Sequence, residues 1–343
     1  MTPFWIFDFR FWIGSRNKVF CFALCSLFIA LSFPVEAQQT GKIFRMGFLD
    51  SSTASASAVR VEAFRQEMRK LGWIEGKNIA IEYRFAEQKP ERLPELAAVL
   101  VGLKVELIVV TSNPVALAAK NATATIPIVM TTSTDPVGVG LVASLARPGG
   151  NVTGLSSLAL DLNTKRLEVL KDTVPKLGRV GLLQWPGTST TSDLQLNALR
   201  AAALALKLKL EQIEMPADPK DLEIVLQTAK QKQVNAIMTI PDPRFFDERK
   251  RIVELAGKYR LPAIYPQKEY VEAGGLMSYG MDSNDLYRRA AVYVDKILKG
   301  TKPADLPIEQ ATKFEFVINL TAAKQMGLTI PVNVLERANK VIR

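Results

Sequence analysis

The chain of 343 residues contains no histidine, and its two cysteines, Cys21 and Cys25, both lie near the N-terminus. Histidine is the commonest general base, and histidine and cysteine are the commonest ligands of transition metals. A Ser-His-Asp or Cys-His catalytic system is therefore impossible, and a zinc site would have to consist of carboxylates alone. An all-oxygen calcium site is not excluded, but no Asp-rich loop of the EF-hand type occurs. We expect neither a metal nor a cofactor.

Motifs that bind nucleotides are also absent: the sequence has no Walker pattern and no GxGxxG fingerprint. The net charge of +10 raises the question of nucleic-acid binding. However, lysine and arginine are scattered along predicted helices and alternate with glutamate, as in residues 65–70. This pattern is typical of solvated helix faces, so we expect no nucleic-acid partner.

The first forty residues have the pattern of a secretory signal peptide. Basic residues precede an apolar run over 19–31, which is shorter than the ~20 residues that a membrane span needs. Val35 and Ala37 fit the small-residue rule for cleavage. We therefore predict a signal peptide over residues 1–37, cut after Ala37, and a protein exported to the periplasm. An uncleaved N-terminal anchor is the alternative. A start codon set too far upstream would explain the aromatic-rich first twelve residues.

After residue 43 the sequence alternates twice between short apolar strands and amphipathic helices. In the first helix, residues 57–71, Val61, Phe64 and Met68 share one face, and Gly72 ends the pattern. Strands and helices in regular alternation indicate parallel sheets covered by helices on both faces. We predict an α/β fold with two Rossmann-like lobes. The predicted strands are 44–49, 79–83, 105–110, 126–130 and 151–155, then 179–183, 208–213, 236–240, 262–265 and 275–280.

The C-terminal segment is too short for a third domain. It contains a predicted long helix (283–298), a strand (314–319) and helical residues from 321 to the end. These elements should complete sheets begun earlier, so the chain must cross between the lobes more than once. We place the crossings near 156–157, 279–280 and 311–312. The predicted first lobe is then 43–156 with 280–311, and the predicted second lobe is 157–279 with 312–343.

The ligand site is expected at the carboxyl ends of the strands, where open parallel sheets bind ligands. The loops there are rich in serine and threonine. Hydroxyls and free N–H groups at helix starts bind carboxylates and other anions, although the same residues also serve as helix caps. The predicted ligand-binding residues are Ser52, Thr111, Ser112 and Asp135 in the first lobe, with Trp185, Asp242 and Tyr279 in the second.

Each class of residue has an expected role. The hydroxyls would hold an anionic or carbonyl end of the ligand, and Asp135 or Asp242 could hold an amino group. Trp185 or Tyr279 could stack on an apolar portion. Asp242 lies between two prolines and could instead cap the following helix. An aromatic or branched amino acid fits this set better than a sugar.

Several segments resemble one protein family; they are 64–73, 132–138, 147–154, 290–300 and 313–320. From Ile43 to Arg343 the chain resembles the bacterial ABC transporter substrate-binding proteins and is similar to their tryptophan- or tyrosine-binding members. The resemblance implies the type I periplasmic-binding fold, with a small molecule held in the cleft between two lobes. It also implies a membrane permease of an ABC transporter, driven by a cytoplasmic ATPase, as the partner.

An enzyme and a ligand sensor are the alternative functions for a two-lobe protein of this kind. A two-lobe enzyme of the paired-cysteine racemase kind is excluded because the mature chain has no cysteine. A carboxylate-based hydrolase would need two placed acids, and Asp135 and Asp242 are the only suggestive pair. A sensor that docks on a membrane receptor would bind its ligand by the same chemistry. Permease and ATPase genes beside this gene would favour transport.

Overall fold

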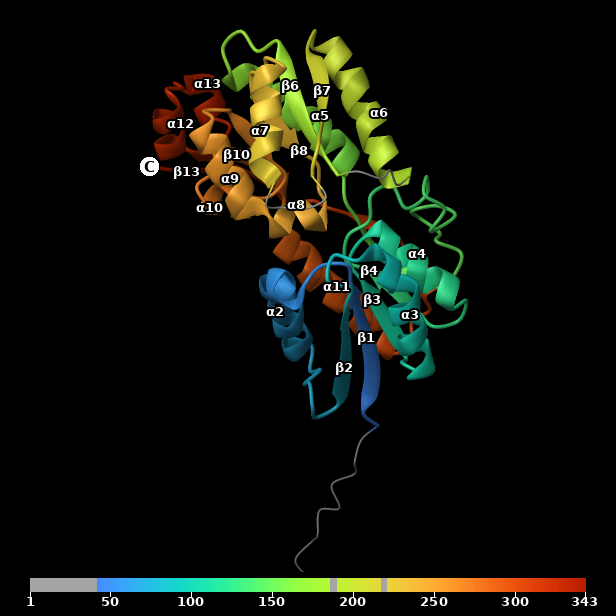
Figure 1. The fold of residues 1–343 in the computed structure, drawn as a ribbon. Coiled ribbons are helices and arrows are strands. Elements are labelled where there is room, and N and C mark those ends of the chain that lie inside the picture. The colour runs from blue at the N-terminus through green and yellow to red at the C-terminus, as the bar shows by residue number, and fades with distance from the viewer. Residues whose placement is uncertain (1–41, 186–189, 217–220) are drawn as a thin grey trace, which may run out of the picture. The chain divides into compact units, whose positions relative to one another are not determined.

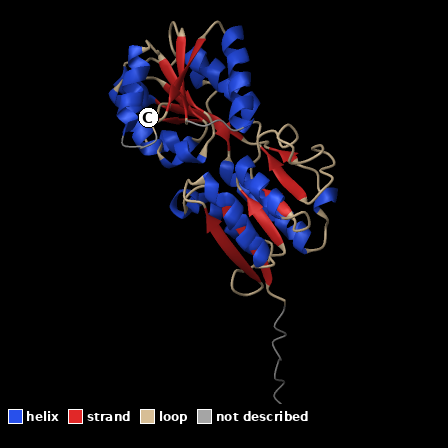
Figure 2. Cartoon of the chain, turned by 45° about the vertical axis from the view of Figure 1, so that its right-hand side comes forward, coloured by secondary structure: helices blue, strands red, loops and turns tan. Residues whose placement is uncertain are grey.

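The computed structural model describes residues 42–185, 190–216 and 221–343. The predicted signal peptide, residues 1–37, lies outside this part of the chain. Within the described residues, no helix has the length and apolar character that a membrane span requires. Residues 43–343 form a single unit built on two sheets, and Figure 2 shows the strands of each sheet among their helices.

The first sheet has the strand order β11-β5-β4-β3-β1-β2, and all of its pairings are parallel. Its strands are β1 (Phe44–Asp50), β2 (Ile79–Phe85), β3 (Leu107–Val110), β4 (Ile128–Met130), β5 (Val152–Ser156) and β11 (Glu309–Gln310). Every residue of β3 is buried. A continuous apolar run of this kind is what a parallel strand covered on both faces requires.

The second sheet has the strand order β13-β12-β10-β9-β8-β6-β7. Its strands are β6 (Arg179–Gln184), β7 (Lys209–Glu214), β8 (Ala236–Thr239), β9 (Ala263–Tyr265), β10 (Met277–Met281), β12 (Phe314–Asn319) and β13 (Lys340–Ile342). The pairings are parallel except that of β10 with β12. We call each sheet, with the helices that cover it, a lobe.

Helices cover both faces of the first sheet. Met46 and Phe48 of β1 pack against α2 (Ala54–Lys70) and α11 (Ser283–Leu298), whereas Leu49 packs on the side of α3 (Leu93–Gly102) and α4 (Asn113–Ala122). This division follows from the two-residue period of a strand. Helix α11 belongs to the first lobe although it comes late in the chain, and it packs along α2 (Figure 1).

The second lobe is built in the same way. Helix α5 (Ala159–Thr173) packs against α6 (Thr190–Ala205), and α7 (Leu222–Gln231) packs against α9 (Arg249–Lys258). The shorter helices are α8 (Pro243–Asp247), α10 (Lys268–Glu272), α12 (Leu320–Met326) and α13 (Val332–Leu335). Short 3₁₀ turns occur at Pro90–Arg92 and Pro303–Asp305. The predicted α/β class with two helix-flanked, largely parallel sheets is therefore confirmed.

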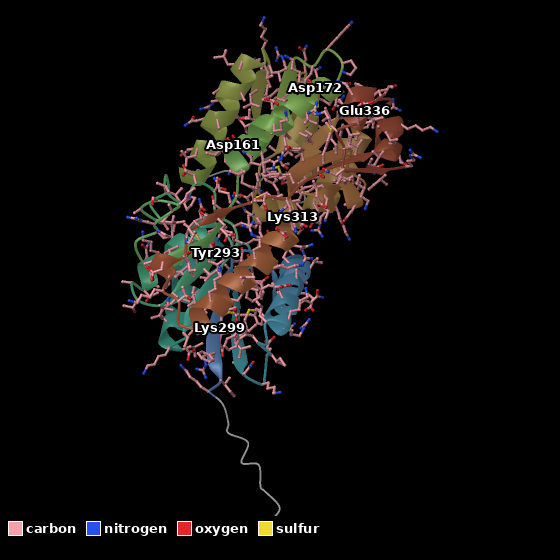
Figure 3. The ribbon with its side chains drawn as sticks, turned by 180° about the vertical axis from the view of Figure 1, so that it is seen from behind. Asp161, Asp172, Tyr293, Lys299, Lys313 and Glu336 are labelled. Atoms are coloured by element: carbon pink, nitrogen blue, oxygen red, sulfur yellow. The ribbon has the colours of Figure 1, made fainter. Side chains whose placement is uncertain are left out.

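The chain passes between the lobes after β5, after β10 and after β11 (Figure 1). Figure 3 shows Lys313 at the last of these passages, and its ammonium pairs with Asp285 of α11 at 2.6 Å. The second passage lies slightly later than expected, because residues 279–280 still pair with β12. The predicted lobe boundaries themselves stay a proposal.

The C-terminal prediction was wrong in one respect. Residues 340–342 form the strand β13 and not the end of a helix, because they pair in parallel with β12. This pairing partner lies more than twenty residues upstream, and a local helical pattern carries no sign of it. Gly327, at φ 71°, ends α12 well before the strand.

Candidate functional site

The main pocket lies where the strand order reverses in both sheets. Each sheet has its first strand between its second and third, which makes a switch point, and such points form the ligand crevice of open α/β sheets. The pocket has a volume of about 190 Å³. The first lobe contributes Ser51, Arg60, Gln88, Thr111, Ser112 and Tyr287, and the second contributes Gln195, Ile240, Asp242, Arg244, Phe246 and Gln267.

Asp50, at the end of β1, organises the floor of the first lobe. Its carboxylate is buried and accepts hydrogen bonds from the Ser52 N–H at 3.0 Å, the Ser57 hydroxyl at 2.6 Å and the Thr111 hydroxyl at 2.9 Å. Thr111 therefore lines the pocket with a hydroxyl that already donates its hydrogen bond to Asp50. A buried carboxylate with three donors is well satisfied and fixes the loops after β1 and β3.

Two neighbouring hydroxyls remain without partners. The Oγ atoms of Ser51 and Ser112 are buried, and neither finds a hydrogen-bond partner among the described residues. Ser112 directly precedes α4 but makes no side-chain capping bond. Buried hydroxyls in native proteins are normally hydrogen-bonded, so two unpartnered ones facing the same pocket are suited to a polar ligand group.

Arg60 places a cation at the same wall. It lies on α2, and its guanidinium reaches Phe246 of the second lobe, with 4.6 Å between the carbon and the ring centre. Its Nε atom is buried without a partner among the described residues. Burial opposes the charge, but the surrounding groups Tyr287, Asp50, Glu269 and Asp247 together raise the pKa of Arg60. Arg60 thus stays protonated and can attract an anion.

Among the described residues of the second lobe, the two charged side chains that line the pocket, Asp242 and Arg244, are paired with each other. Asp242 accepts hydrogen bonds from the Arg244 backbone N–H at 2.8 Å, from its Nε at 3.0 Å and from its Nη2 at 2.7 Å. Asp242 is therefore the N-cap of α8, the alternative that its sequence context left open. The charges of Asp242 and Arg244 therefore cancel. Among the described residues that line the pocket, Arg60 is the charged one that has no bonded counter-ion.

Direct contacts join the lobes beside the pocket. The Asp247 carboxylate, at the end of α8, accepts hydrogen bonds from the Ser52 hydroxyl at 3.1 Å and from Gln88 Nε2 at 2.6 Å. Burial raises the pKa of Asp247, although these two donors act in the opposite direction. Phe246 lies between two guanidiniums, because Arg249 approaches its ring centre to 4.4 Å.

The seven predicted ligand-binding residues are distributed unevenly. Thr111, Ser112 and Asp242 line the pocket, whereas Ser52 is not among its lining residues and bonds to Asp247. Asp135 has a φ of 47°, accepts a hydrogen bond from the Gly138 N–H at 2.9 Å, and lines a separate cavity. These positions leave the predicted ligand contacts untested.

The two aromatic candidates pack within the second lobe. Trp185 lies against Phe245 with 5.7 Å between ring centres, and the Arg244 guanidinium is 5.2 Å from its ring. Tyr279 packs edge-on against Phe316 at 5.9 Å. Neither is among the residues that line the main pocket. The aromatic surface that faces the pocket comes instead from Phe246 and Tyr287.

Sequence reasoning missed Arg60, Gln88, Gln195, Phe246 and Tyr287. Arg60 carried a signal, because it directly precedes Val61, the first residue of the apolar face predicted for this helix. The other four are ordinary helix or loop residues that only the folded chain brings to the pocket. Among the described residues there is no cluster of three or more metal-ligating side chains.

Comparisons with known proteins agree with this geometry. A tyrosine-binding protein of Clostridioides difficile is 28% identical over 268 residues, which cover 78% of this chain and 76% of that protein. A conserved domain protein from Vibrio cholerae has a crystal structure with a TM-score of 0.80 and 30% identity, covering 88% of this chain and all of that one. The ABC domain from Streptococcus pneumoniae in complex with L-Trp has a TM-score of 0.79 and 26% identity, with the same coverage.

The structural neighbours have the type I periplasmic-binding fold, as the sequence resemblance implied. The model of one family, described as ABC transporter substrate binding protein, matches residues 53–342. This match covers the strands from β2 to β13, every passage between the lobes and the pocket residues named above except Ser51, so the chain belongs to the family of ABC transporter substrate-binding proteins.

Proposed function

We propose that this protein is the periplasmic solute-binding component of an ABC importer and captures an amino acid between its lobes. One observation carries the proposal. The first-lobe wall of the pocket offers the unpartnered hydroxyls of Ser51 and Ser112 together with the Arg60 guanidinium. Such a set fits a carboxylate, because charge-assisted hydrogen bonds are the strong ones.

The rest of the pocket favours an apolar side chain on the ligand. Phe246 and Ile240 come from the second lobe and Tyr287 from the first. Burial raises the pKa of Tyr287 to about 12, so its ring stays neutral at physiological pH. The names of the two relatives that bind tyrosine and L-Trp support an aromatic amino acid. The family binds solutes and is not one of enzymes, which removes the enzyme alternative.

The proposal is tested by thermal shift and calorimetry on residues 38–343. The panel consists of L-tryptophan, L-tyrosine, L-phenylalanine and L-leucine, with tryptamine as the matched control that lacks the carboxylate. A ligand at a hundred times its dissociation constant stabilises by about 2.7 kcal/mol, which raises the melting temperature by roughly 5 °C or more. We expect an aromatic amino acid to do so and tryptamine to fail. Equal binding of tryptamine would contradict the carboxylate assignment.

Export and transport need tests of their own. N-terminal sequencing of protein from a periplasmic fraction should begin at Gln38. Deletion of the gene should abolish high-affinity uptake of the labelled ligand if the partner is a permease. Normal uptake in the deletion strain, with binding proven, would favour the alternative of a sensor that docks on a membrane receptor.

A further inference from the structure

Arg166 is a buried cation that the binding proposal does not use. It lies on α5, whose two ends are marked by Asp161 and Asp172 in Figure 3. Its side chain is fully buried, and its hydrogen bonds in the described part of the chain go to a carbonyl and an amide oxygen and to no carboxylate. A buried charge without a counter-ion is costly, so its bonds call for an explanation.

Those bonds lead in two directions. Arg166 Nε donates to the carbonyl of Tyr279 at 2.6 Å, on the strand that leads out of the second lobe. Arg166 Nη1 donates to Asn163 Oδ1, one helical turn earlier on α5. Burial lowers the pKa of Arg166 to about 9, which still leaves the guanidinium protonated at neutral pH. Arginine then has donors only, and both of its partners must accept.

The hydrogen bond from Arg166 to Asn163 fixes the orientation of the next amide, that of Gln195, which lines the pocket. Because Asn163 Oδ1 accepts from Arg166, its Nδ2 is the group left to donate, and it does so to Gln195 Oε1 at 2.9 Å. Gln195 is buried and lines the main pocket. With Oε1 held by Asn163, the end of the Gln195 amide that remains for a ligand is the N–H₂ group.

We propose that Arg166 is a positioning residue that, through Asn163, makes Gln195 present a hydrogen-bond donor to the pocket. The second lobe therefore selects a ligand group that accepts, such as a carboxylate or carbonyl oxygen. This inference rests on the proposed function, because it assumes that the pocket receives a ligand. It adds a specificity determinant from the lobe opposite Ser51 and Ser112.

The sharpest test reverses the chain of bonds. In Asn163→Asp the new carboxylate still accepts from Arg166 but has no proton to donate to Gln195. Gln195 must then turn its amide, bond through Nε2, and present its carbonyl to the pocket. The fold should persist, because Arg166 gains a counter-ion, and the melting temperature should not fall. Replacing Arg166 itself is a poorer test, since an empty buried site can unfold the lobe.

Affinity for L-tryptophan and L-tyrosine is measured by calorimetry in the parent, Asn163→Asp, Gln195→Met and the double variant. We expect Asn163→Asp to weaken binding about ten- to a hundredfold, as for a lost bond to a charged group. In the Gln195→Met background, Asn163→Asp should have no further effect. Parental affinity in Asn163→Asp, or a full additional loss in the double variant, would overturn the inference.

A second readout needs no ligand. In ¹⁵N-labelled protein, the Gln195 side-chain amide protons should exchange quickly in the parent and more slowly in Asn163→Asp, where they bond to the new carboxylate. The signal is assigned by its absence in Gln195→Met. Unchanged exchange would show that the amide did not turn and would refute the positioning role. A parent that binds neither probe would refute the proposed function while leaving this readout intact.

Discussion

At the residue scale, the pocket shows why a hydroxyl-rich loop is an incomplete predictor of a ligand site. The Thr111 hydroxyl donates its hydrogen bond to Asp50, which lies 61 positions away in the sequence. The Ser52 hydroxyl donates to Asp247, which lies 195 positions away. Ser51 and Ser112 have no such partners among the described residues. The sequence indicates which loops carry hydroxyls, but only the folded chain decides which of them are already satisfied.

A substitution of Arg60 tests whether its charge contributes to ligand binding. Arg60→Gln removes the cation that has no bonded carboxylate among the described pocket residues. It should weaken binding of L-tryptophan about tenfold or more and reduce the preference for L-tryptophan over L-tryptophanamide. Arg65→Gln is the matched control on the same helix, because Arg65 is only partly buried, pairs with Glu75 at 2.9 Å and does not line the pocket. Calorimetry of both variants against acid and amide checks the prediction. Equal losses in the two variants would point to a general charge effect.

Substitutions of Asp242 and Ser112 can distinguish a helix-capping role from direct contact with the ligand. We expect Asp242→Ala to weaken binding roughly ten- to a hundredfold and Ser112→Ala to cost less. Asp242→Ala also loses a helix cap worth about 1 kcal/mol, whereas Asp242→Asn keeps an N-cap residue and removes only the charge. Unfolding and calorimetry are measured on all three. If both Asp242 variants bound like the parent, the residue would be a helix cap and nothing more.

At the element scale, the hydrophobic runs predicted the main strands closely. The strand expected over 44–49 is β1, Phe44–Asp50, and the long helix expected over 283–298 is α11 with the same bounds. The local pattern could not show β11, because it has only two residues and both are exposed. It exists because Glu309 and Gln310 pair with β5, which is a tertiary relationship.

Strand β10 has a tight point at which packing leaves no room for a side chain. A Cβ atom on Gly280 would lie 1.8 Å from the Pro266 carbonyl oxygen. We expect Gly280→Ala to shift the strand and destabilise the protein by about 2 kcal/mol or more. Gly257→Ala, in α9 with no atom within 4 Å of the new Cβ, should instead be neutral or stabilising by up to about 1 kcal/mol. Urea unfolding of the pair checks the contrast, and equal destabilisation would argue against the clash.

At the scale of the whole molecule, residues 43–343 combine several passages between lobes with direct interlobe contacts. We expect rigid lobes joined in this way to move by hinge bending. The contacts of Ser52 and Gln88 with Asp247 can form only when the lobes are close together. We therefore predict closure by a hinge motion, in which closing makes these contacts and opening breaks them.

Ligand binding should compact the protein. We expect the radius of gyration from small-angle scattering to fall when the ligand identified by thermal shift is added. Ser52→Ala combined with Gln88→Ala should leave the free protein more open without changing the pocket hydroxyls Ser51 and Ser112. An unchanged radius with ligand proven bound would count against a hinge.

Closure of the free protein should also depend on pH through Asp247. Its pKa is raised above 3.8 where burial between the lobes opposes its charge. The closed form therefore holds the proton more tightly, so closure is favoured at acid pH and weakens as pH rises through the raised value. Scattering between pH 4 and 7 should show gradual opening, and Asp247→Asn should remove the trend. The same pH response in both proteins would assign it to another group.

The order of elements along the chain governs when the molecule can fold during synthesis. The ribosome must pass α11 before the apolar face of Phe64 and Met68 on α2 is covered, and it must pass β12 and β13 before the second sheet is complete. Neither lobe can therefore complete its fold until about the last sixth of the polypeptide has been synthesised. A nascent chain that cannot fold early stays in the extended state that a protein-conducting channel accepts, and until then its exposed apolar faces depend on chaperones.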